Sequence, residues 1–155
     1  MKSFQPQKGE KMAQKDMIFQ FCDQARETSF ALHKFLRHGH KEKIYENGLV
    51  NRLRRQGMDV EQQPTLSVFD EDGTLLGTLD IDLLVVGELV IELKAVKALL
   101  NEHVAQLLGY LRASRKEHGL LINFGAPSLK SKNTRSPSTS TPNLNFCALL
   151  SPFCG

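Results

Sequence analysis

The sequence has few cysteines, no tryptophan and no long apolar run, and these shortages exclude several classes of protein. Only Cys22, Cys147 and Cys154 are cysteine, which is too few and too scattered for a disulfide framework, and no pair has the spacing of a zinc site. A reduced, cytoplasmic setting is the simplest interpretation. No stretch approaches the roughly 20 apolar residues of a membrane span. The polar N-terminal stretch also lacks the apolar run of a secretory signal.

An excess of charge of one sign is also missing. The formal net charge is +3, and the 20 lysine and arginine residues are not concentrated in one run. Such a mild charge is compatible with a nucleic-acid partner but does not argue for one. With 155 residues, of which 41% are hydrophobic, the chain has room for one globular domain with one core, plus tails.

Composition divides the chain into three parts. Residues 1–16 are polar, rich in lysine and glutamine, and aperiodic, which predicts a disordered leader. Residues 17–129 carry the periodic apolar patterns of a folded domain. Residues 130–155 are rich in serine, threonine, asparagine and proline, which predicts a disordered, low-complexity tail. We expect that residues 1–15 and 131–145 have no stable structure and can be removed without unfolding the domain.

The spacing of apolar residues predicts the elements of the domain. Period two over residues 58–69 and 75–86 predicts a hairpin around the turn at 70–73, and Gly87 permits a reversal into a third strand. Gly39 is suited to the left-handed position that ends a helix. The order α-α-β-β-β-α-β indicates an α/β (α+β) fold, with helices at 17–36, 41–56 and 102–116 and strands at 58–69, 75–86, 89–95 and 119–124.

Three charged residues are expected to meet on one face of the sheet. Alternation places Asp82 on the face opposite Ile81 and Leu83, and it places Glu92 and Lys94 together on the next strand. Two adjacent carboxylates repel each other unless a cation lies between them, and Mg²⁺ accepts carboxylate oxygens, backbone carbonyls and water. Lys94 would then point at a phosphate held by the metal. The competing interpretation is an ordinary ion pair on a solvated strand face.

The flanking helices carry further candidates. Glu42 lies one turn before Tyr45 and continues a buried stripe, so its carboxylate needs a partner that a metal site would supply. The alternative is an acid favoured by the helix dipole. Gln106 and Tyr110 lie four residues apart, one turn after His103 and off the leucine stripe. They are placed to hydrogen-bond a phosphate or to hold the lysine, or they simply face solvent.

These residues resemble a known family. Asp82, Glu92-Leu93-Lys94 and Gln106-x-x-x-Tyr110 look like the core of the PD-(D/E)XK nuclease superfamily, in its RecB-like branch. Gly39-x-x-Glu42-x-x-Tyr45, followed by this core and by GLLINFGAPSL, resembles the family called GxxExxY proteins. The resemblance covers about residues 17 to 130. Ile81 rather than proline precedes Asp82, which is a departure from the superfamily pattern.

The resemblance implies a fold, a site and an activity. The fold would be a restriction-endonuclease-like α-β-β-β-α-β core with a central mixed sheet flanked by helices. The activity would be hydrolysis of phosphodiester bonds in nucleic acid, with DNA as the first partner to test, Mg²⁺ or Mn²⁺ as cofactor and no membrane partner. The implied residues are Asp82, Glu92 and Lys94 as the catalytic set; Glu42, Asp82, Glu92 and the carbonyl of Leu93 as metal ligands; and Tyr45, Gln106 and Tyr110 as supporting or nucleic-acid-binding groups.

Two hypotheses compete with a nuclease. One is a catalytically weak module that keeps the fold and binds nucleic acid. The other is a protein-interaction module in which the acidic pocket is vestigial. The intact set Asp82, Glu92 and Lys94 argues against both, because a vestigial site usually loses the lysine or one of the acids.

Overall fold

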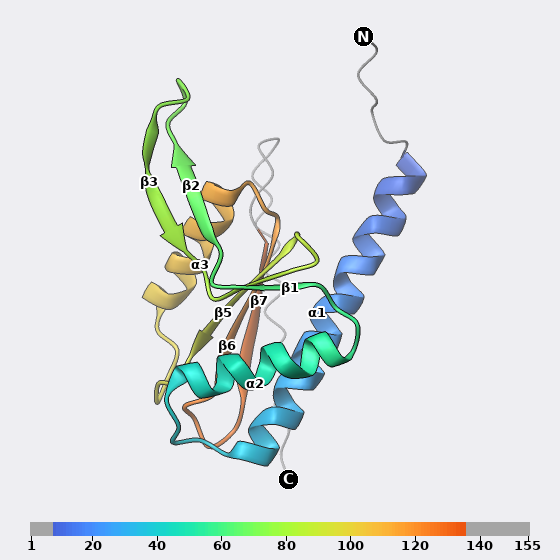
Figure 1. The fold of residues 1–155 in the computed structure, drawn as a ribbon, viewed down its shortest axis with the longest axis vertical. Helices are drawn as coiled ribbons and strands as arrows, with labels where there is room; N and C mark the ends of the chain where they lie inside the picture. The colour runs from blue at the N-terminus through green and yellow to red at the C-terminus, as the bar shows by residue number, and fades with distance from the viewer. Residues whose placement is uncertain (1–7, 136–155) are drawn as a thin grey trace.

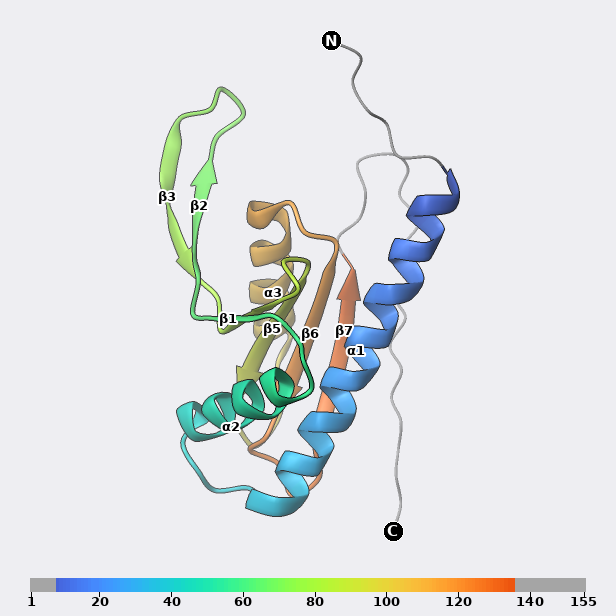
Figure 2. The same cartoon turned by 45° about the vertical axis from the view of Figure 1, so that its right-hand side comes forward.

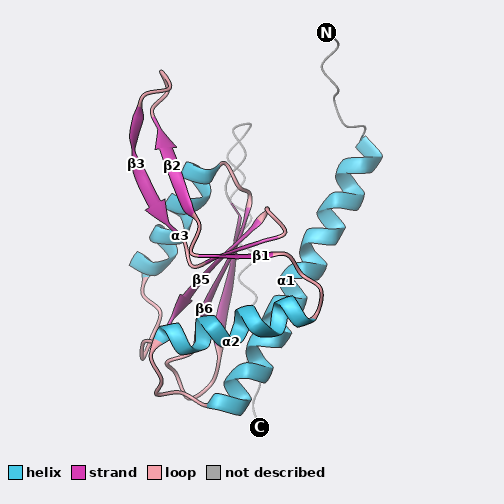
Figure 3. Ribbon diagram, in the orientation of Figure 1, coloured by secondary structure: helices cyan, strands magenta, loops and turns pink. Residues whose placement is uncertain are grey.

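The computed structural model describes residues 8–135, with side chains for residues 16–129 and 131–134 (Figures 1 and 3). The helices are α1 Lys8–Leu36, α2 Glu42–Arg55 and α3 Asn101–Ser114. The strands are β1 Val60–Gln62, β2 Thr65–Phe69, β3 Leu75–Asp80, β4 Leu83–Val85, β5 Leu89–Lys94, β6 His118–Asn123 and β7 Lys130–Arg135. Within the described part of the chain, no helix is both long and apolar enough to cross a membrane.

A five-stranded mixed sheet forms the centre, in the order β1-β4-β5-β6-β7. Strands β5 and β6 are parallel, and the other neighbours are antiparallel. Helix α3 supplies the crossover from β5 to β6, as a parallel pair requires. Helices α1 and α2 lie on one face of the sheet and α3 on the other (Figure 2). The predicted class, a mixed sheet flanked by helices, is confirmed.

Alternation along β5 divides the core between the two faces. Ile91 and Leu93 pack in the cluster beneath α1 and α2, whereas Val90 packs against α3. Each of these side chains is fully buried, which contributes about 1.5–3 kcal/mol relative to an exposed side chain. In the first cluster the rings of Tyr45 and Phe124 stack with centroids 4.6 Å apart. The strand that carries the candidate site is therefore fixed from both sides.

The predicted hairpin differs from the observed one. Each of its two long strands is broken, so that β1 and β4 join the central sheet while β2 and β3 form a separate two-stranded sheet that projects from the body (Figure 1). The first break lies at Gln63, whose φ of 52° is left-handed, next to Pro64, which has no N–H to donate. The second lies between β3 and β4, where Ile81 packs toward α3 and Leu83 toward α1 and α2. The expectation that Ile81 and Leu83 share a face is therefore wrong.

The first helix is longer than predicted. It begins at Lys8, so a disordered leader is wrong for residues 8–16, while residues 1–7 lie outside the described part. Lysine, glutamate, alanine, glutamine and methionine are good helix formers, and a helix that is already nucleated extends at little cost. The helix ends at Leu36, and Arg37 with φ 61° takes the left-handed position instead of Gly39.

The start of the predicted tail is a strand. Residues 130–135 form β7 and pair along their whole length with the antiparallel β6. Their polar composition misled the prediction, because an edge strand needs backbone hydrogen bonds rather than an apolar face, and polar side chains are common there. The prediction of disorder is wrong for these residues, and residues 136–155 lie outside the described part.

Candidate metal and catalytic site

Strands β4 and β5 bring the predicted carboxylates together. Leu83 is paired with Ile91 in antiparallel register, and continuing this register by one residue places Asp82 opposite Glu92. The backbone N–H of Leu93 donates to Oδ2 of Asp82 at 2.6 Å, which fixes the Asp82 carboxylate against β5. Glu92 shares a face with Val90, on the α3 side of the sheet.

Glu92 is an unusually placed acid. Its side chain is almost fully buried, with 3% of the residue exposed. Oε1 lies 2.8 Å from Nζ of Lys94, whereas Oε2 is buried and has no hydrogen-bond partner among the described residues. Burial and, next, the charge of Asp82 raise the pKa of Glu92 to about 7, although the hydrogen bond from Lys94 opposes this. A buried acceptor without a donor calls for a cation or a proton.

Asp82 and Lys94 are perturbed by the same surroundings. Burial raises the pKa of Asp82, the N–H of Leu93 lowers it, and the charge of Glu46 raises it further. For Lys94, burial alone would lower the pKa, but the hydrogen bond and charge of Glu92 outweigh this and raise it. Lys94 therefore stays a cation at neutral pH, aimed at the same space as the two acids.

Glu42 belongs to the same electrostatic cluster. It opens α2 and is half-buried. Burial raises its pKa, and the charge of Asp82 is the second cause, while Lys94 and the backbone of Ala95 lower it. An acid in the first turn is favoured by the helix dipole in any case. The Glu42 carboxylate is thus within electrostatic range of Asp82 and Lys94.

On α3, Nε2 of Gln106 donates to the hydroxyl of Tyr110 at 2.6 Å. Burial raises the pKa of Tyr110, the bond from Gln106 lowers it, and the charge of Glu92 raises it. Tyr110 packs against the core cluster on the α3 side of the sheet, which contains Val90, the neighbour of Glu92 on that face. His103 is placed elsewhere, because its Nδ1 accepts the N–H of Leu100 and closes the start of the helix.

Tyr45 lies inside the protein. Its side chain has 0% exposure, and its hydroxyl donates to the carbonyl of Arg37 at 2.5 Å and accepts the N–H of His40 at 3.2 Å. These bonds hold the loop that leads into α2, and so the position of Glu42. Its burial contradicts a direct contact between Tyr45 and nucleic acid, and leaves it a supporting role.

Glu46 is a buried acid that the sequence reasoning missed. It is 3% exposed and follows Glu42 by one helical turn. Its Oε1 accepts Nζ of Lys43 at 2.7 Å and Nε2 of Gln62 at 2.6 Å, and its Oε2 lies 3.4 Å from Nε2 of Gln63. The signal was available, because Glu46 follows Glu42 at a spacing of four residues on the same face.

Asn123, also missed, fixes the chain beyond Lys94. Its fully buried amide accepts the N–H groups of Val96 and Gly125, each at 3.0 Å, and donates to the carbonyl of Val96 at 2.8 Å. Gly125 has to be glycine, because a Cβ there would overlap the Val96 backbone. The amide thus ties the exit of β5 to the end of β6, at the level of Lys94.

The donor set fits a hard divalent ion. Asp82 and Glu92 offer carboxylate oxygens with raised pKa values, and Glu92 has an unpartnered Oε2. Such an ion also takes backbone carbonyls and water, so the carbonyl of Leu93 would complete the set. Among the described residues, no three His, Cys, Asp or Glu side chains are close enough to form a metal site by themselves. An ion would therefore keep several water ligands, as Mg²⁺ commonly does.

Comparisons with known proteins bear on the family and the fold of the chain. A family model described as the PD-(D/E)XK nuclease superfamily matches residues 20–136. Among solved structures, the crystal structure of SSO0001 is similar, with a TM-score of 0.52 and 20% identity over 62% of this chain and 50% of that one. The chain thus spans half the length of that protein, and the likeness concerns the fold alone. No curated protein matches the sequence. The predicted restriction-endonuclease-like fold is confirmed.

Proposed function

Because the chain belongs to the PD-(D/E)XK nuclease superfamily, we propose that it is a divalent-metal-dependent nuclease that hydrolyses phosphodiester bonds in nucleic acid. The observation that carries this proposal is the buried Glu92, whose Oε2 has no partner among the described residues while Lys94 holds its other oxygen. A buried ion pair kept only for structure would be expected to satisfy both carboxylate oxygens.

The residues divide the chemistry between them. Asp82, Glu92 and the carbonyl of Leu93 would hold Mg²⁺ or Mn²⁺, with Glu42 as a further acid on the open side. When bound, such an ion polarises a phosphoryl oxygen and lowers the pKa of a water ligand toward about 7. Lys94 is a cation fixed by Glu92, and it would orient the attacking water or stabilise the charge that develops on the phosphoryl group.

Finer assignments follow from the residues around the site. Gln106 and Tyr110 present an amide and a hydroxyl toward the acids and would contact the substrate phosphate. The motif Gly39-x-x-Glu42-x-x-Tyr45 supports membership of the GxxExxY family in the RecB-like branch. We take DNA as the first substrate to test and the cytoplasm as the compartment.

A cleavage screen tests the proposal. The protein is incubated with single- and double-stranded DNA and RNA, in Mg²⁺ or Mn²⁺, beside Lys94→Ala. We expect metal-dependent cleavage of at least one substrate by the wild type and a loss of at least about 100-fold in the variant, because charge stabilisation in the transition state is lost.

The matched control is Lys116→Ala, which removes a lysine that pairs with the exposed Glu88 at 3.4 Å and should leave cleavage unchanged. Binding without cleavage of any substrate would instead favour the catalytically weak binding module. Equal activity of wild type and Lys94→Ala would show that the cleavage comes from a contaminant or another site.

A further inference from the structure

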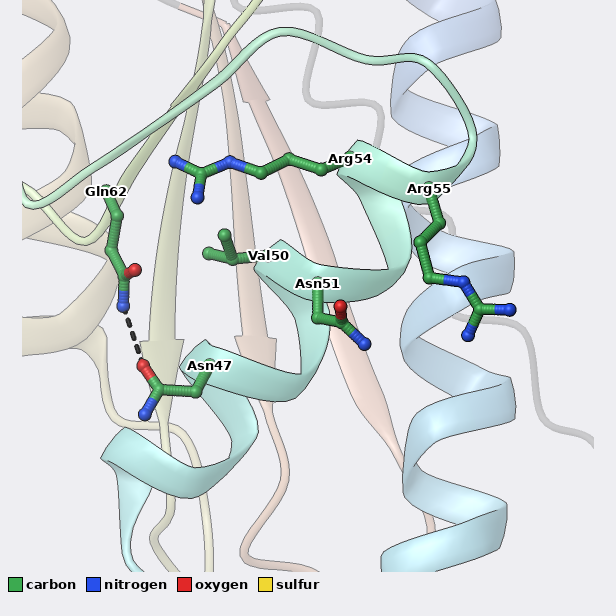
Figure 4. A pocket seen from close by; sticks show the side chains of 6 residues that line it. All are labelled: Asn47, Val50, Asn51, Arg54, Arg55 and Gln62. Atoms are coloured by element: carbon green, nitrogen blue, oxygen red, sulfur yellow. Dashed lines mark hydrogen bonds between the residues drawn. The ribbon is translucent and has the colours of Figure 1, made fainter.

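Helix α2 and strand β1 border a polar groove beside the candidate site. Its volume is about 480 Å³. Figure 4 shows Arg54 and Gln62 on one side of it and Arg55 on the other, with Asn51 between them. The groove, named here the α2–β1 groove, is lined by Asn47, Val50, Asn51, Arg54, Arg55 and Gln62. These residues include two arginines and no acid, so the groove attracts anions.

The groove presents hydrogen-bond donors that the fold does not use. Arg54 donates Nε and Nη2 to the carbonyl of Val60, at 3.3 and 2.7 Å, which leaves its Nη1 available. Oδ1 of Asn47 accepts Nε2 of Gln62 at 2.8 Å, which leaves the Nδ2 donor of Asn47 (Figure 4). In the described part of the chain, the exposed side chains of Asn51 and Arg55 have no hydrogen bond or ion pair. Guanidinium and amide donors without a carboxylate suit a phosphate.

Helix electrostatics explain only part of this arrangement. Arginines in the last turn complement the carbonyl end of a helix, and α2 has three: Arg52, Arg54 and Arg55. Arg52 points elsewhere, with its guanidinium carbon 5.6 Å from the ring centroid of Phe35. The helix dipole gives no reason for two exposed amides, Asn47 and Asn51, four residues apart on the same stripe as the groove arginines.

The groove is joined to the candidate site. Nε2 of Gln62 bridges Oδ1 of Asn47 and Oε1 of Glu46, at 2.8 and 2.6 Å. The next residue, Gln63, donates its backbone N–H to the carbonyl of Asp82 at 2.7 Å. Along α2, Arg54 lies twelve residues after Glu42, or about 18 Å. At about 3.4 Å of axial rise per nucleotide, that corresponds to roughly five nucleotides of one strand.

We propose that the α2–β1 groove binds the phosphate backbone of a nucleic-acid strand, a few nucleotides away from the bond held at the carboxylates. The assignment rests on the proposed function insofar as it takes the bound strand to be the substrate. Contacts of this kind position a strand without reading its sequence. The groove would therefore set how the strand runs across the protein, along α2 toward Glu42 and Asp82.

Binding measured without metal tests the groove separately from catalysis. The probe is a fluorescein-labelled DNA of 25 nucleotides, single-stranded or duplex, whose anisotropy is followed in EDTA over a range of NaCl concentrations. Arg55→Gln and Asn51→Asp alter the groove. Arg52→Gln removes the same charge from the same turn outside the groove, and Gln20→Glu adds an acid to an exposed position of α1. Melting curves confirm that all four variants fold.

We expect Arg55→Gln to weaken binding about tenfold, as the loss of one charge-assisted phosphate contact would. The slope of log K against log salt should become shallower by about 0.7 for the single strand or about 0.9 for the duplex. Asn51→Asp should weaken binding at least as much, because it places an acid among the phosphates. Arg52→Gln and Gln20→Glu should bind like the wild type.

Three results would overturn the assignment. The first is that the groove variants bind DNA like the wild type. The second is that Arg52→Gln loses as much affinity as Arg55→Gln, which would show that the effect comes from net charge and not from the groove. Alternatively, millimolar inorganic phosphate could displace the DNA from the wild type but not from Arg55→Gln, which would show a site for free anions. Failure of the nuclease proposal can be distinguished from failure of the groove proposal. If the wild type cleaves no substrate, the binding assay in EDTA still shows whether the groove binds DNA.

Discussion

Nζ of Lys94 lies 2.8 Å from Oε1 of Glu92, while Oε2 of the same carboxylate is buried without a partner in the described part of the chain. The two residues are two positions apart on β5 and so share a face of the sheet. Their pairing is incomplete, because Oε2 of Glu92 has lost its hydrating water on burial and has gained no hydrogen bond in return. Such a group either takes up a proton or binds a cation, and both alternatives can be measured.

The first prediction concerns pH and stability without metal. The pKa of Glu92 rises from 4.5 to about 7 on folding, so between these values the folded state binds a proton that the unfolded chain has lost. Stability should therefore fall as the pH rises through this range, by at most about 3 kcal/mol. The raised pKa values of Asp82 and Glu42 act in the same direction.

Urea unfolding in EDTA at pH 5 and pH 8 measures this difference. Glu92→Gln should remove most of it, while Glu88→Gln, at an exposed position, should keep it. Equal pH dependence in the wild type and Glu92→Gln would show that the buried carboxylate does not titrate in this range.

The second prediction concerns metal and stability. Mn²⁺ that binds only the folded arrangement should raise the melting temperature, with a gain of about 2.7 kcal/mol at 100-fold over its dissociation constant. Asp82→Asn should abolish this shift, because it removes a charged ligand. It should leave the metal-free protein at least as stable, because a repulsion with Glu92 is lost and the amide oxygen still accepts the N–H of Leu93.

Thermal melts of both proteins with and without Mn²⁺ decide the matter. If the acids formed only a structural ion-pair cluster, Mn²⁺ would not change the melting temperature of the wild type, and Asp82→Asn would melt at a lower temperature than the wild type. The metal-induced shift should grow as the pH rises from 5 to about 7 and level off above that, because the ion competes with the proton on Glu92 only while this carboxyl is protonated.

Alternation on one strand explains why the placement of Glu92 and Lys94 on one face could be predicted from the sequence. The run Leu89–Lys94 has buried residues on both faces, so the placement of Glu92 and Lys94 follows from period two alone. Asp82 reaches Glu92 as expected, but not by uninterrupted alternation. The chain bends at Ile81 and Asp82. The pairing of Leu83 with Ile91 then brings Asp82 opposite Glu92.

Other features depend on contacts that a local pattern does not contain. The apolar pattern before the turn at 70–73 continues through Gln63 and Pro64, although these residues end the pairing with β4. Strand β7 pairs with β6 through backbone hydrogen bonds, and the side-chain pattern of residues 130–135 does not predict a strand. For Glu46 the sequence contains the spacing of four residues from Glu42, but not the contacts with Gln62 and Gln63 that bury its carboxylate.

The third prediction separates two tyrosines. Tyr45→Phe should lower the free energy of unfolding by about 1–2 kcal/mol, because the carbonyl of Arg37 and the N–H of His40 lose their buried partner. It should leave DNA affinity unchanged. Tyr110→Phe removes a half-buried hydroxyl bonded to Gln106, and should change stability by less than about 0.5 kcal/mol.

Unfolding curves and DNA-binding isotherms of the two variants provide the comparison. If Tyr110 contacts the substrate phosphate, Tyr110→Phe weakens binding or cleavage while Tyr45→Phe does not. A Tyr45→Phe protein of normal stability but reduced DNA affinity would restore Tyr45 as a direct contact.

The last prediction concerns β7. All six residues of β7 pair with β6, in which Leu120, Leu121 and Ile122 have 0% exposure. A chain ending at Leu129 would leave one side of β6 without hydrogen-bond partners and open an apolar edge. We expect it to lose at least about 3 kcal/mol of stability and to aggregate. A chain ending at Arg135 should melt like the full chain.

A third protein, with residues 131–134 permuted, separates backbone pairing from side-chain identity. If the main-chain pairing with β6 is what holds β7, the permuted chain should melt close to the wild type, and Mn²⁺ should still shift its melting temperature. If the chain ending at Leu129 is as stable as the full chain, β7 contributes nothing to the domain. If permutation alone is as damaging as deletion, the side chains of residues 131–134 hold the strand, and the inference from backbone pairing is wrong.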